Sequence, residues 1–364
     1  MVIINLAGCY NLNLIPNNIV VTPMESRLKL SVLDQSIVRK AGSASQAIAE
    51  TIQIAKLTDE LGYSRFWVSE HHNSIMIAGS VPELLMVKLA DETNRIRIGS
   101  GGIMLPNHSA LKIAESFRML ETLFPGRIDL GIGRAPGSDR ITASLLNPSN
   151  TFSEESYLQQ LEHLQAFFND EAATQYGPIL AVPQSATIPQ QWILSSSGGS
   201  SLIAARFGLG LAVAKFINGY AAPDMVESYR KNFQSSASFN EPHALLAMQV
   251  LCADTEEKAT KLRKASDYVL LQFEKGHFEP IGGYNEIKDY TFSPMEMERI
   301  KINSGRIVSG TPDGVKEQLT KLAADFNISE IIVSCMAFSL EDRKHSFELL
   351  AEAFELKRNS EVLV

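Results

Sequence analysis

The pattern of hydrophobic and polar positions switches repeatedly between a strand-like and a helix-like form along most of the chain. From residue 28 onward, short runs of aliphatic and β-branched residues are each followed by a longer segment with helical spacing. Four apolar residues of one such segment recur at intervals of four, three and four residues, on one face of a helix: Ile113, Phe117, Leu120 and Phe124. The same pattern predicts eight strands, over residues 28–33, 65–68, 96–99, 127–131, 192–194, 209–213, 244–252 and 331–333.

This alternation of strands and helices predicts the α/β fold class. Strands that alternate with helices form mostly parallel sheets with right-handed crossovers. Eight strand–helix units favour a closed (β/α)8 TIM barrel over an open sheet. Residues 275–306 are rich in Gly, Pro and Tyr and are predicted to be a long loop insertion. Loops of that length in compact domains usually serve as lids or binding loops.

The chain has 364 residues, and a TIM barrel can exceed 400 residues as one domain. We therefore predict one barrel domain over residues 27–364, preceded by a disordered leader at residues 1–26. Within the leader, the stretch from Leu6 to Cys9 resembles a lipoprotein cleavage box. Because the segment before Cys9 has no Lys or Arg and is shorter than a signal core, we expect no lipid attachment.

Charge and cysteine usage narrow the class of protein. The chain carries 41 acidic and 33 basic residues, a formal charge of -8 that is spread along its length and argues against a nucleic-acid partner. No apolar run approaches the roughly 20 residues of a membrane span. Cys9, Cys252 and Cys335 are isolated and form no disulfide or metal framework, which predicts a cytoplasmic location.

The second predicted strand ends in two adjacent histidines, within the sequence Ser69, Glu70, His71, His72, Asn73. Functional groups of a TIM barrel gather where strands end. Side chains of neighbouring residues there point to opposite sides, so at most one of the two imidazoles faces a site. Such a histidine could act on a bound ligand, ligate a metal or be purely structural, although no third metal ligand accompanies the pair.

Three further strand ends carry unusual residues. Glycines within residues 99–102 allow either close approach of a ligand or an ordinary turn. Arg134, which lies between glycines, could reach a phosphate or carbonyl with its forked donors, or pair with a nearby carboxylate. Residues 195–201 are serines and glycines before a predicted helix, where exposed N–H groups would bind an anion. A flexible linker is the alternative for that last segment.

Together these motifs resemble the luciferase-like flavin-dependent monooxygenases, in particular the branch of alkanal-monooxygenase-like enzymes. The likeness rests on the order and spacing of residues 69–72, 99–106 and 124–134 and extends over residues 28–356. It implies that His71 performs acid–base work beside the flavin and that Gly101–Gly102 is a cis peptide against its ring. It further implies that Arg134 approaches the flavin phosphate or ring edge. The residues that it implies for holding the phosphate are Ser196, Ser197, Gly198, Gly199 and Ser200.

The resemblance also implies an activity. Reduced FMN, supplied by a separate NAD(P)H:flavin reductase, would react with dioxygen to form a flavin hydroperoxide and oxidise a small organic substrate. The likeness implies a homodimer and no metal. Deazaflavin-dependent hydride transfer on the same fold and a non-catalytic flavin-binding subunit are the alternatives. Two positions depart from the family pattern. Gly133 stands in place of a reactive cysteine, which weakens any expectation of light emission or of an aldehyde substrate. Ser196 stands in place of a glutamate, which removes a negative charge from the phosphate site and leaves FMN binding intact.

Overall fold

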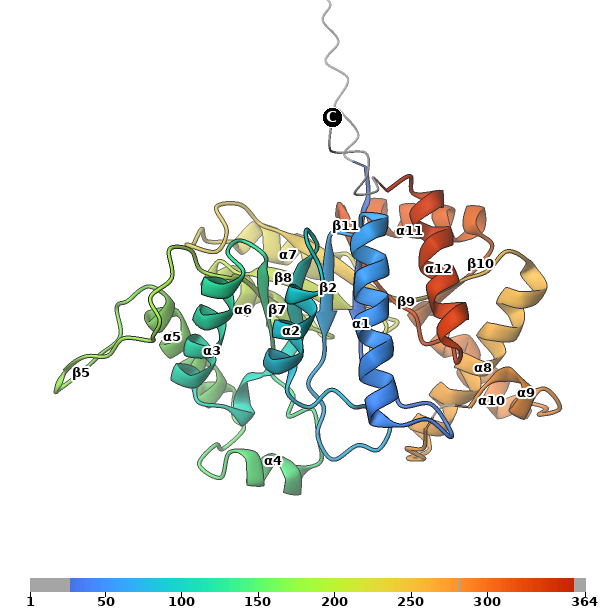
Figure 1. Ribbon diagram of the computed structural model, residues 1–364, viewed down its shortest axis with the longest axis horizontal. Helices are drawn as coiled ribbons and strands as arrows, with labels where there is room; N and C mark the ends of the chain where they lie inside the picture. Colours follow the sequence, from blue (N-terminus) through green and yellow to red (C-terminus); the bar gives the residue numbers. More distant parts are fainter. Residues whose placement is uncertain (1–26, 281, 357–364) are drawn as a thin grey trace, which may run out of the picture.

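The computed structural model describes residues 27–280 and 282–356, which form a closed barrel of eight parallel strands surrounded by helices (Figure 1). The predicted (β/α)8 fold is thereby confirmed. Around the barrel the strands follow one another in chain order, and the ring closes where the last one pairs with the first. They are β1 (Lys29–Asp34), β2 (Arg65–Val68), β3 (Arg97–Met104), β4 (Ile128–Gly133), β7 (Gln190–Ser195), β8 (Gly210–Ala214), β9 (Ala244–Cys252) and β11 (Glu330–Ser334).

The helices pack their apolar faces on the outside of this barrel. On α3 the predicted stripe is confirmed, because Ile113, Phe117 and Leu120 are fully buried. Ser43 caps the start of α1 by accepting a hydrogen bond from the backbone N–H of Gln46 at 3.2 Å. The outer helices are α1 (Ala44–Leu61), α2 (Pro82–Asp91), α3 (Ala110–Leu123), α5 (Glu154–Phe168), α6 (Gly199–Phe207), α7 (Asp224–Asn232), α8 (Glu256–Glu274), α11 (Pro312–Asp325) and α12 (Leu340–Ala353).

The segment from 275 to 306 differs from the predicted long loop. It contains α9 (Tyr284–Ile287), α10 (Pro294–Asn303) and the 3₁₀ helix η2 (Ser304–Arg306). A capping box between Ser293 and Glu296, with proline at the first turn, starts α10. The composition of this segment obscured those local signals. A ninth parallel strand that we did not predict, β10 (Ile307–Gly310), follows and pairs with residues 249–252 of β9.

Smaller elements project from the barrel. Strand β3 is longer than predicted and includes the glycines that we had placed beyond its end. It leads into the 3₁₀ helix η1 (Leu105–Asn107), and α4 (Arg140–Leu146) follows β4 at the lower edge of Figure 1. A hairpin of β5 (Ala173–Thr174) and β6 (Gly177–Pro178) extends away from the barrel at the left.

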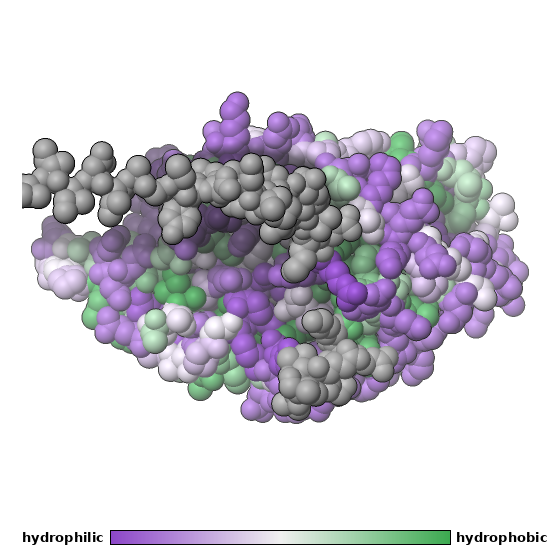
Figure 2. Space-filling model, turned by 90° about the horizontal axis from the view of Figure 1, so that it is seen from above, coloured by the Kyte–Doolittle hydropathy of each residue, from purple (hydrophilic) through white to green (hydrophobic). Residues whose placement is uncertain are grey.

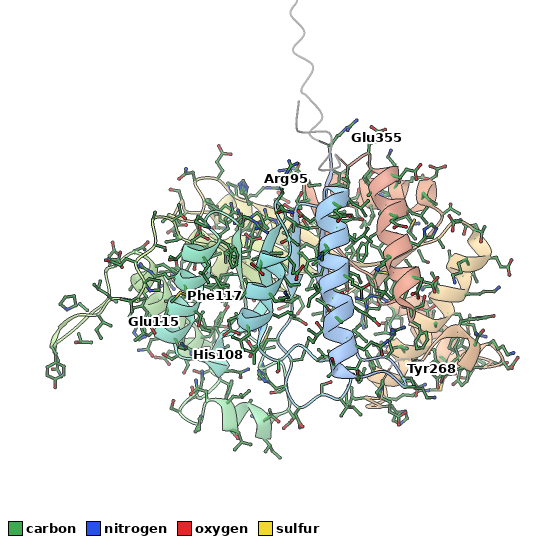
Figure 3. The ribbon with its side chains drawn as sticks, viewed as in Figure 1. Arg95, His108, Glu115, Phe117, Tyr268 and Glu355 are labelled. Atoms are coloured by element: carbon green, nitrogen blue, oxygen red, sulfur yellow. The ribbon has the colours of Figure 1, made fainter. Side chains whose placement is uncertain are left out.

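The two ends of the barrel can be recognised from labelled side chains. In Figure 3, Arg95, just before β3, lies at the upper end, and His108, just after it, lies near the lower end. The carboxyl ends of the parallel strands therefore face downward in that view. The upper end, seen in Figure 2, carries mainly hydrophilic side chains with apolar ones in small groups.

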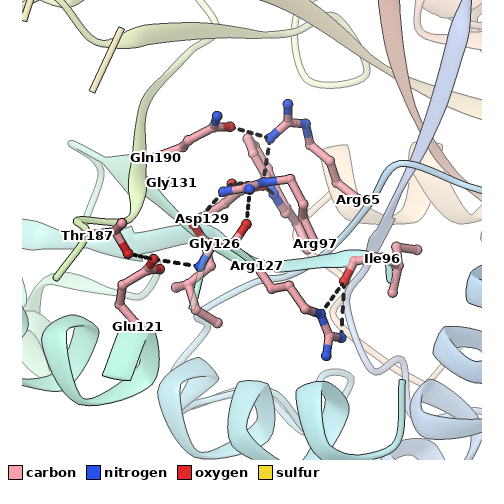
Figure 4. A network of polar contacts seen from close by, with 12 residues as sticks. Arg65, Ile96, Arg97, Glu121, Gly126, Arg127, Asp129, Gly131, Thr187 and Gln190 are labelled. Atoms are coloured by element: carbon pink, nitrogen blue, oxygen red, sulfur yellow. Dashed lines mark hydrogen bonds and ion pairs between the residues drawn. The ribbon is translucent and has the colours of Figure 1, made fainter. Parts of the chain in front are cut away.

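An ion-pair network holds the amino-terminal end of the barrel together (Figure 4). Asp129 is fully buried and accepts hydrogen bonds from Arg65 and Arg97, each at 2.8 Å, and from the indole of Trp67 at 3.0 Å. Burial alone would raise the pKa of Asp129, but the two guanidinium groups outweigh it and hold that pKa below its ordinary value. Arg65 also contacts Glu330 of β11 at 2.7 Å, so the network links four strands.

The predicted leader, including Cys9, lies outside the described residues. Cys252 and Cys335 are buried, and burial raises the pKa of the Cys252 thiol to about 12. No helix in the part of the chain that the structure describes is long and apolar enough to cross a membrane.

Candidate active site

A cavity of about 900 Å³, the first cavity, opens at the carboxyl ends of the barrel strands. Its lining comes from all eight barrel strands or the loops that follow them. It includes seven of the nine residues predicted for the site: His71, Gly101, Gly102, Arg134, Ser196, Ser197 and Ser200. Gly198 and Gly199 belong to the same turn but are not among the residues that line the cavity. The volume lies within the range typical of cofactor and ligand sites.

A second cavity of about 960 Å³ adjoins the first. It lies between α8, Phe278 with residues 282–286, and the loop that joins β11 to α12. Four residues line both cavities: Gln35, His71, Phe216 and Ile217. A molecule in the second cavity would therefore reach the contents of the first along the wall that contains His71.

The two histidines after β2 have different surroundings. His71 is half-buried, lines both cavities and donates a hydrogen bond from its backbone N–H to Gly79 at 2.9 Å. The ring of His72 instead contacts the carboxylate of Glu70 at 2.8 Å. Burial lowers the pKa of His71 below its ordinary value, so its imidazole is neutral at neutral pH and can accept a proton.

Glu70, to which we assigned no role from the sequence, joins the loop after β2 to the end of β3 and the segment that follows it. Its carboxylate is fully buried and accepts hydrogen bonds from the backbone N–H of Met104 at 2.8 Å and from Asn107 at 3.1 Å. The ring of His108 contacts the same carboxylate at 2.9 Å. Burial opposes ionisation of Glu70, but its partners, His108 first, lower its pKa. This carboxylate thereby fixes the loop that carries His71 against the end of β3.

Two consecutive glycines, Gly101 and Gly102, line the first cavity. The peptide bond between Gly101 and Gly102 is cis, as predicted. A Cβ on Gly102 would lie 2.1 Å from Cδ1 of Leu194 and 2.7 Å from the carbonyl oxygen of Gly131. Any side chain at this position would have to displace the neighbouring backbone. Close packing against Leu194 and Gly131 thus requires glycine at this position, and the pair lines the cavity with backbone alone, against which a flat ring can lie.

The turn between β7 and α6 offers an anion site at the other end of the first cavity. Helix α6 begins after Gly198, and nothing lies within 4 Å of a Cβ built on Gly198 or Gly199. The carbonyl of Ser196 accepts a hydrogen bond from Asn218 at 2.8 Å, which orients the turn. The N–H groups and the positive end of the helix dipole at this open turn suit a phosphate.

Arg134 and Ser69 complete the wall. Arg134 contacts Glu154 at 2.9 Å at the exposed rim, so its guanidinium pairs with a loop carboxylate and also lines the first cavity. The pairing with a nearby carboxylate is thus observed, and a contact of Arg134 with a phosphate or carbonyl stays a prediction. Ser69 is buried, lines the same cavity, and its hydroxyl has no hydrogen-bond partner among the described residues. A buried hydroxyl without a partner is costly unless a ligand satisfies it.

These features fit a flavin mononucleotide. The backbone of Gly101 and Gly102 suits a flat ring, the Ser69 hydroxyl provides an unused hydrogen-bonding group, and the start of α6 suits a single phosphate. Among the residues that the structure describes, no cluster of three or more His, Cys, Asp or Glu side chains could hold a metal ion.

Comparison with known proteins identifies the family. The model of the luciferase-like monooxygenase family matches residues 28–326, so the chain belongs to this family. The Bacillus subtilis protein YwcH is 43% identical over 330 residues, which cover 90% of this chain and 99% of YwcH. The N-acetyl-S-alkylcysteine monooxygenase of Bacillus subtilis is 32% identical over 329 residues, which cover 90% of this chain and 98% of that enzyme.

Solved structures agree with this assignment. The crystal structure of apo-MsnO8 is 34% identical, with a TM-score of 0.86, and the match covers 91% of this chain and 100% of that one. Two more distant structures share the fold alone. The oxygenating constituent of Pseudomonas putida 3,6-diketocamphane monooxygenase, in complex with FMN, is 18% identical with a TM-score of 0.67 and covers 92% and 99% of the two chains. An F420-dependent secondary alcohol dehydrogenase is 10% identical with a TM-score of 0.63 and covers 90% and 99%.

The prediction that the start of α6 binds the flavin phosphate can be tested by adding one negative charge to this turn. Replacing Gly198 with Asp would place a carboxylate beside the bound phosphate and is expected to weaken FMN binding at least tenfold, about 1.4 kcal/mol. Space for the new side chain is available, since nothing lies within 4 Å of a Cβ there. Gly198→Asn, which has nearly the same shape and no charge, should bind FMN within a few fold of wild type. Equal affinity of the two variants by fluorescence quenching would remove this turn from the site.

Proposed function

We propose that this protein is an oxidoreductase that uses reduced FMN and dioxygen to insert one oxygen atom into a small organic substrate. Membership of the luciferase-like monooxygenase family supports the reaction class. The observation that carries the proposal is the pair of adjoining cavities that meet at His71. The first cavity would hold the flavin and the second the substrate.

The roles of the protein's own residues follow from their positions. The N–H groups at the start of α6 would bind the phosphate, and Gly101 and Gly102 would support the ring. Reduced FMN, when bound, supplies the electrons that activate dioxygen. His71, neutral and half-buried between the cavities, would accept or return a proton at its imidazole during the reaction. The apolar walls would exclude water.

We propose that a separate NAD(P)H:flavin reductase supplies the reduced flavin. The glycines around Arg134 do not complete a dinucleotide-binding fingerprint, because GxGxxG is not fulfilled and no helix begins directly after them. The chain would therefore receive its cofactor already reduced. A homodimer remains a prediction from the family resemblance.

The cofactor assignment is tested by anaerobic titration of the full chain with reduced FMN and, separately, with reduced deazaflavin F420. We expect reduced FMN to bind at least tenfold more tightly, because its terminal phosphate monoester offers the N–H groups at the start of α6 more charge than the phosphodiester of F420 does. Tighter binding of the deazaflavin would favour hydride transfer without dioxygen. Binding of FMN without oxidation of any substrate would favour a non-catalytic flavin-binding subunit.

A further inference from the structure

The second cavity is mainly apolar, and most of the charges at its wall are neutralised by close partners. Apolar side chains of α8 and of the loop after β11 dominate its wall: Leu262, Val269, Leu270, Phe273, Met336 and Phe338. Lys258 contacts Asp342 at 2.8 Å, and both belong to the wall. Lys261 contacts Glu257 at 2.6 Å, and Glu286 contacts Lys40 at 2.6 Å. In these two pairs the partners Glu257 and Lys40 do not line the cavity, but each pair joins one positive to one negative group at short distance.

Arg306 is different, because it shares its carboxylate partner with another arginine. Its Nη1 lies 3.4 Å from Oε1 of Glu274, which is a long contact. Glu274 is already bound by Arg299 through both oxygens, at 2.7 and 2.8 Å, and by the amide of Asn303 at 3.0 Å. Two guanidinium groups therefore face one carboxylate, and one positive charge remains uncompensated within this cluster. The side chain of Arg306 is 21% exposed, so water screens that charge only partly.

The position of Arg306 relates this charge to the reaction site. Arg306 lines the second cavity and not the first. A Cβ built on Gly219 would lie 3.2 Å from Cγ of Arg306, so the arginine packs against the loop that follows β8. That loop includes Phe216 and Ile217, which line both cavities. The stem of Arg306 thus packs against the loop that also contributes to the shared wall, and Arg306 lines the second cavity.

We propose that the second cavity binds an organic acid with an apolar body, and that Arg306 binds its carboxylate. The forked donors of arginine match a carboxylate and form strong charge-assisted hydrogen bonds with it. The apolar walls would bury the rest of the molecule and hold its reacting atom toward His71. This inference rests on the proposed function only in taking the second cavity as the substrate site. Arg306 is a specificity-determining residue under this proposal.

Binding of two probes that differ only in charge tests the inference. N-acetyl-S-benzylcysteine and its methyl ester are titrated into the full chain and into Arg306→Gln by calorimetry. The wild-type chain is expected to bind the acid at least tenfold more tightly than the ester. In Arg306→Gln the affinity for the acid should fall at least tenfold, while that for the ester changes less than twofold. Arg306→Lys, which keeps the charge but loses the fork, should lie between the two.

Arg206→Gln is the matched control, because Arg206 pairs with Glu162 on the exposed side of α6 and lines neither cavity. It changes the net charge equally and should leave both affinities unchanged. Equal binding of acid and ester by the wild-type chain, or failure of both to bind, would overturn the proposal. An equal loss of both probes in Arg306→Gln would also overturn it. Failure of the proposed monooxygenase function would look different, since the probes would bind with the expected ratio but remain unoxidised.

Discussion

Replacing His71 with Asn is expected to lower the rate of substrate oxidation by roughly 10²–10⁴-fold, the usual contribution of a general acid or base. Asparagine keeps a polar side chain of similar reach but cannot exchange a proton near neutral pH. Because His71 reaches both cavities at their shared wall, FMN affinity should stay within a few fold of wild type. The assay is reductase-coupled substrate oxidation, with FMN affinity measured in parallel.

The neighbouring histidine provides the control. The ring of His72 contacts Glu70, so His72→Asn should lower stability more than turnover. The pH profile gives a further check. Burial lowers the pKa of the His71 imidazole below its ordinary value of 6.5. The wild-type rate should therefore persist on acidification until the pH reaches this lowered pKa, where the imidazole becomes protonated. A wild-type rate in His71→Asn, or a loss confined to His72→Asn, would assign the proton transfer elsewhere.

Replacing Asp129 with Asn is expected to lower the free energy of unfolding by about 3–5 kcal/mol. The change leaves the guanidinium groups of Arg65 and Arg97 without their buried carboxylate, deep in the network of Figure 4. Equilibrium unfolding in urea measures the loss. Glu162→Gln, at the exposed pair with Arg206, should change the same quantity by no more than about 1 kcal/mol.

The Asp129 effect should depend on pH in a defined direction. The folded-state pKa of Asp129 is lowered from 3.8, so its contribution to stability is complete above that value. As the pH falls through the folded-state pKa, the carboxyl group becomes protonated and the contribution disappears. Wild type and Asp129→Asn should therefore converge in stability in strong acid. A constant difference across that range would show that charge is not the source of the stabilisation.

The sequence predicted the barrel because its strands are apolar runs that differ sharply from the amphipathic helices between them. Strand β2, over Arg65–Val68, has the predicted bounds. Short β10 and the helices of residues 284–306 were missed, since Gly, Pro and Tyr in this region concealed the capping box at Ser293. Local pattern cannot show that β10 extends the sheet, because its pairing with β9 is a tertiary contact.

The parts of the candidate site that could be predicted from the sequence are those whose residue types have few other roles at a strand end. The cis bond at Gly101–Gly102 is confirmed, and the structure places His71, but not His72, in the cavity wall. Glu70 was missed because its role depends on Met104, Asn107 and His108, which only the folded chain brings to it. The catalytic role of His71 stays a prediction.

The proposed monooxygenase function is tested most directly by following the oxygen atoms of dioxygen into the products. The full chain would be supplied with FMN, NADH, a flavin reductase and isotopically labelled dioxygen, with N-acetyl-S-benzylcysteine as the probe. We expect an oxygenated product that carries one labelled oxygen atom, with the second atom released as water, and no product without FMN or dioxygen. If the chain binds both reduced FMN and the probe but yields no product, or a product labelled only from water, the proposed monooxygenase function is contradicted.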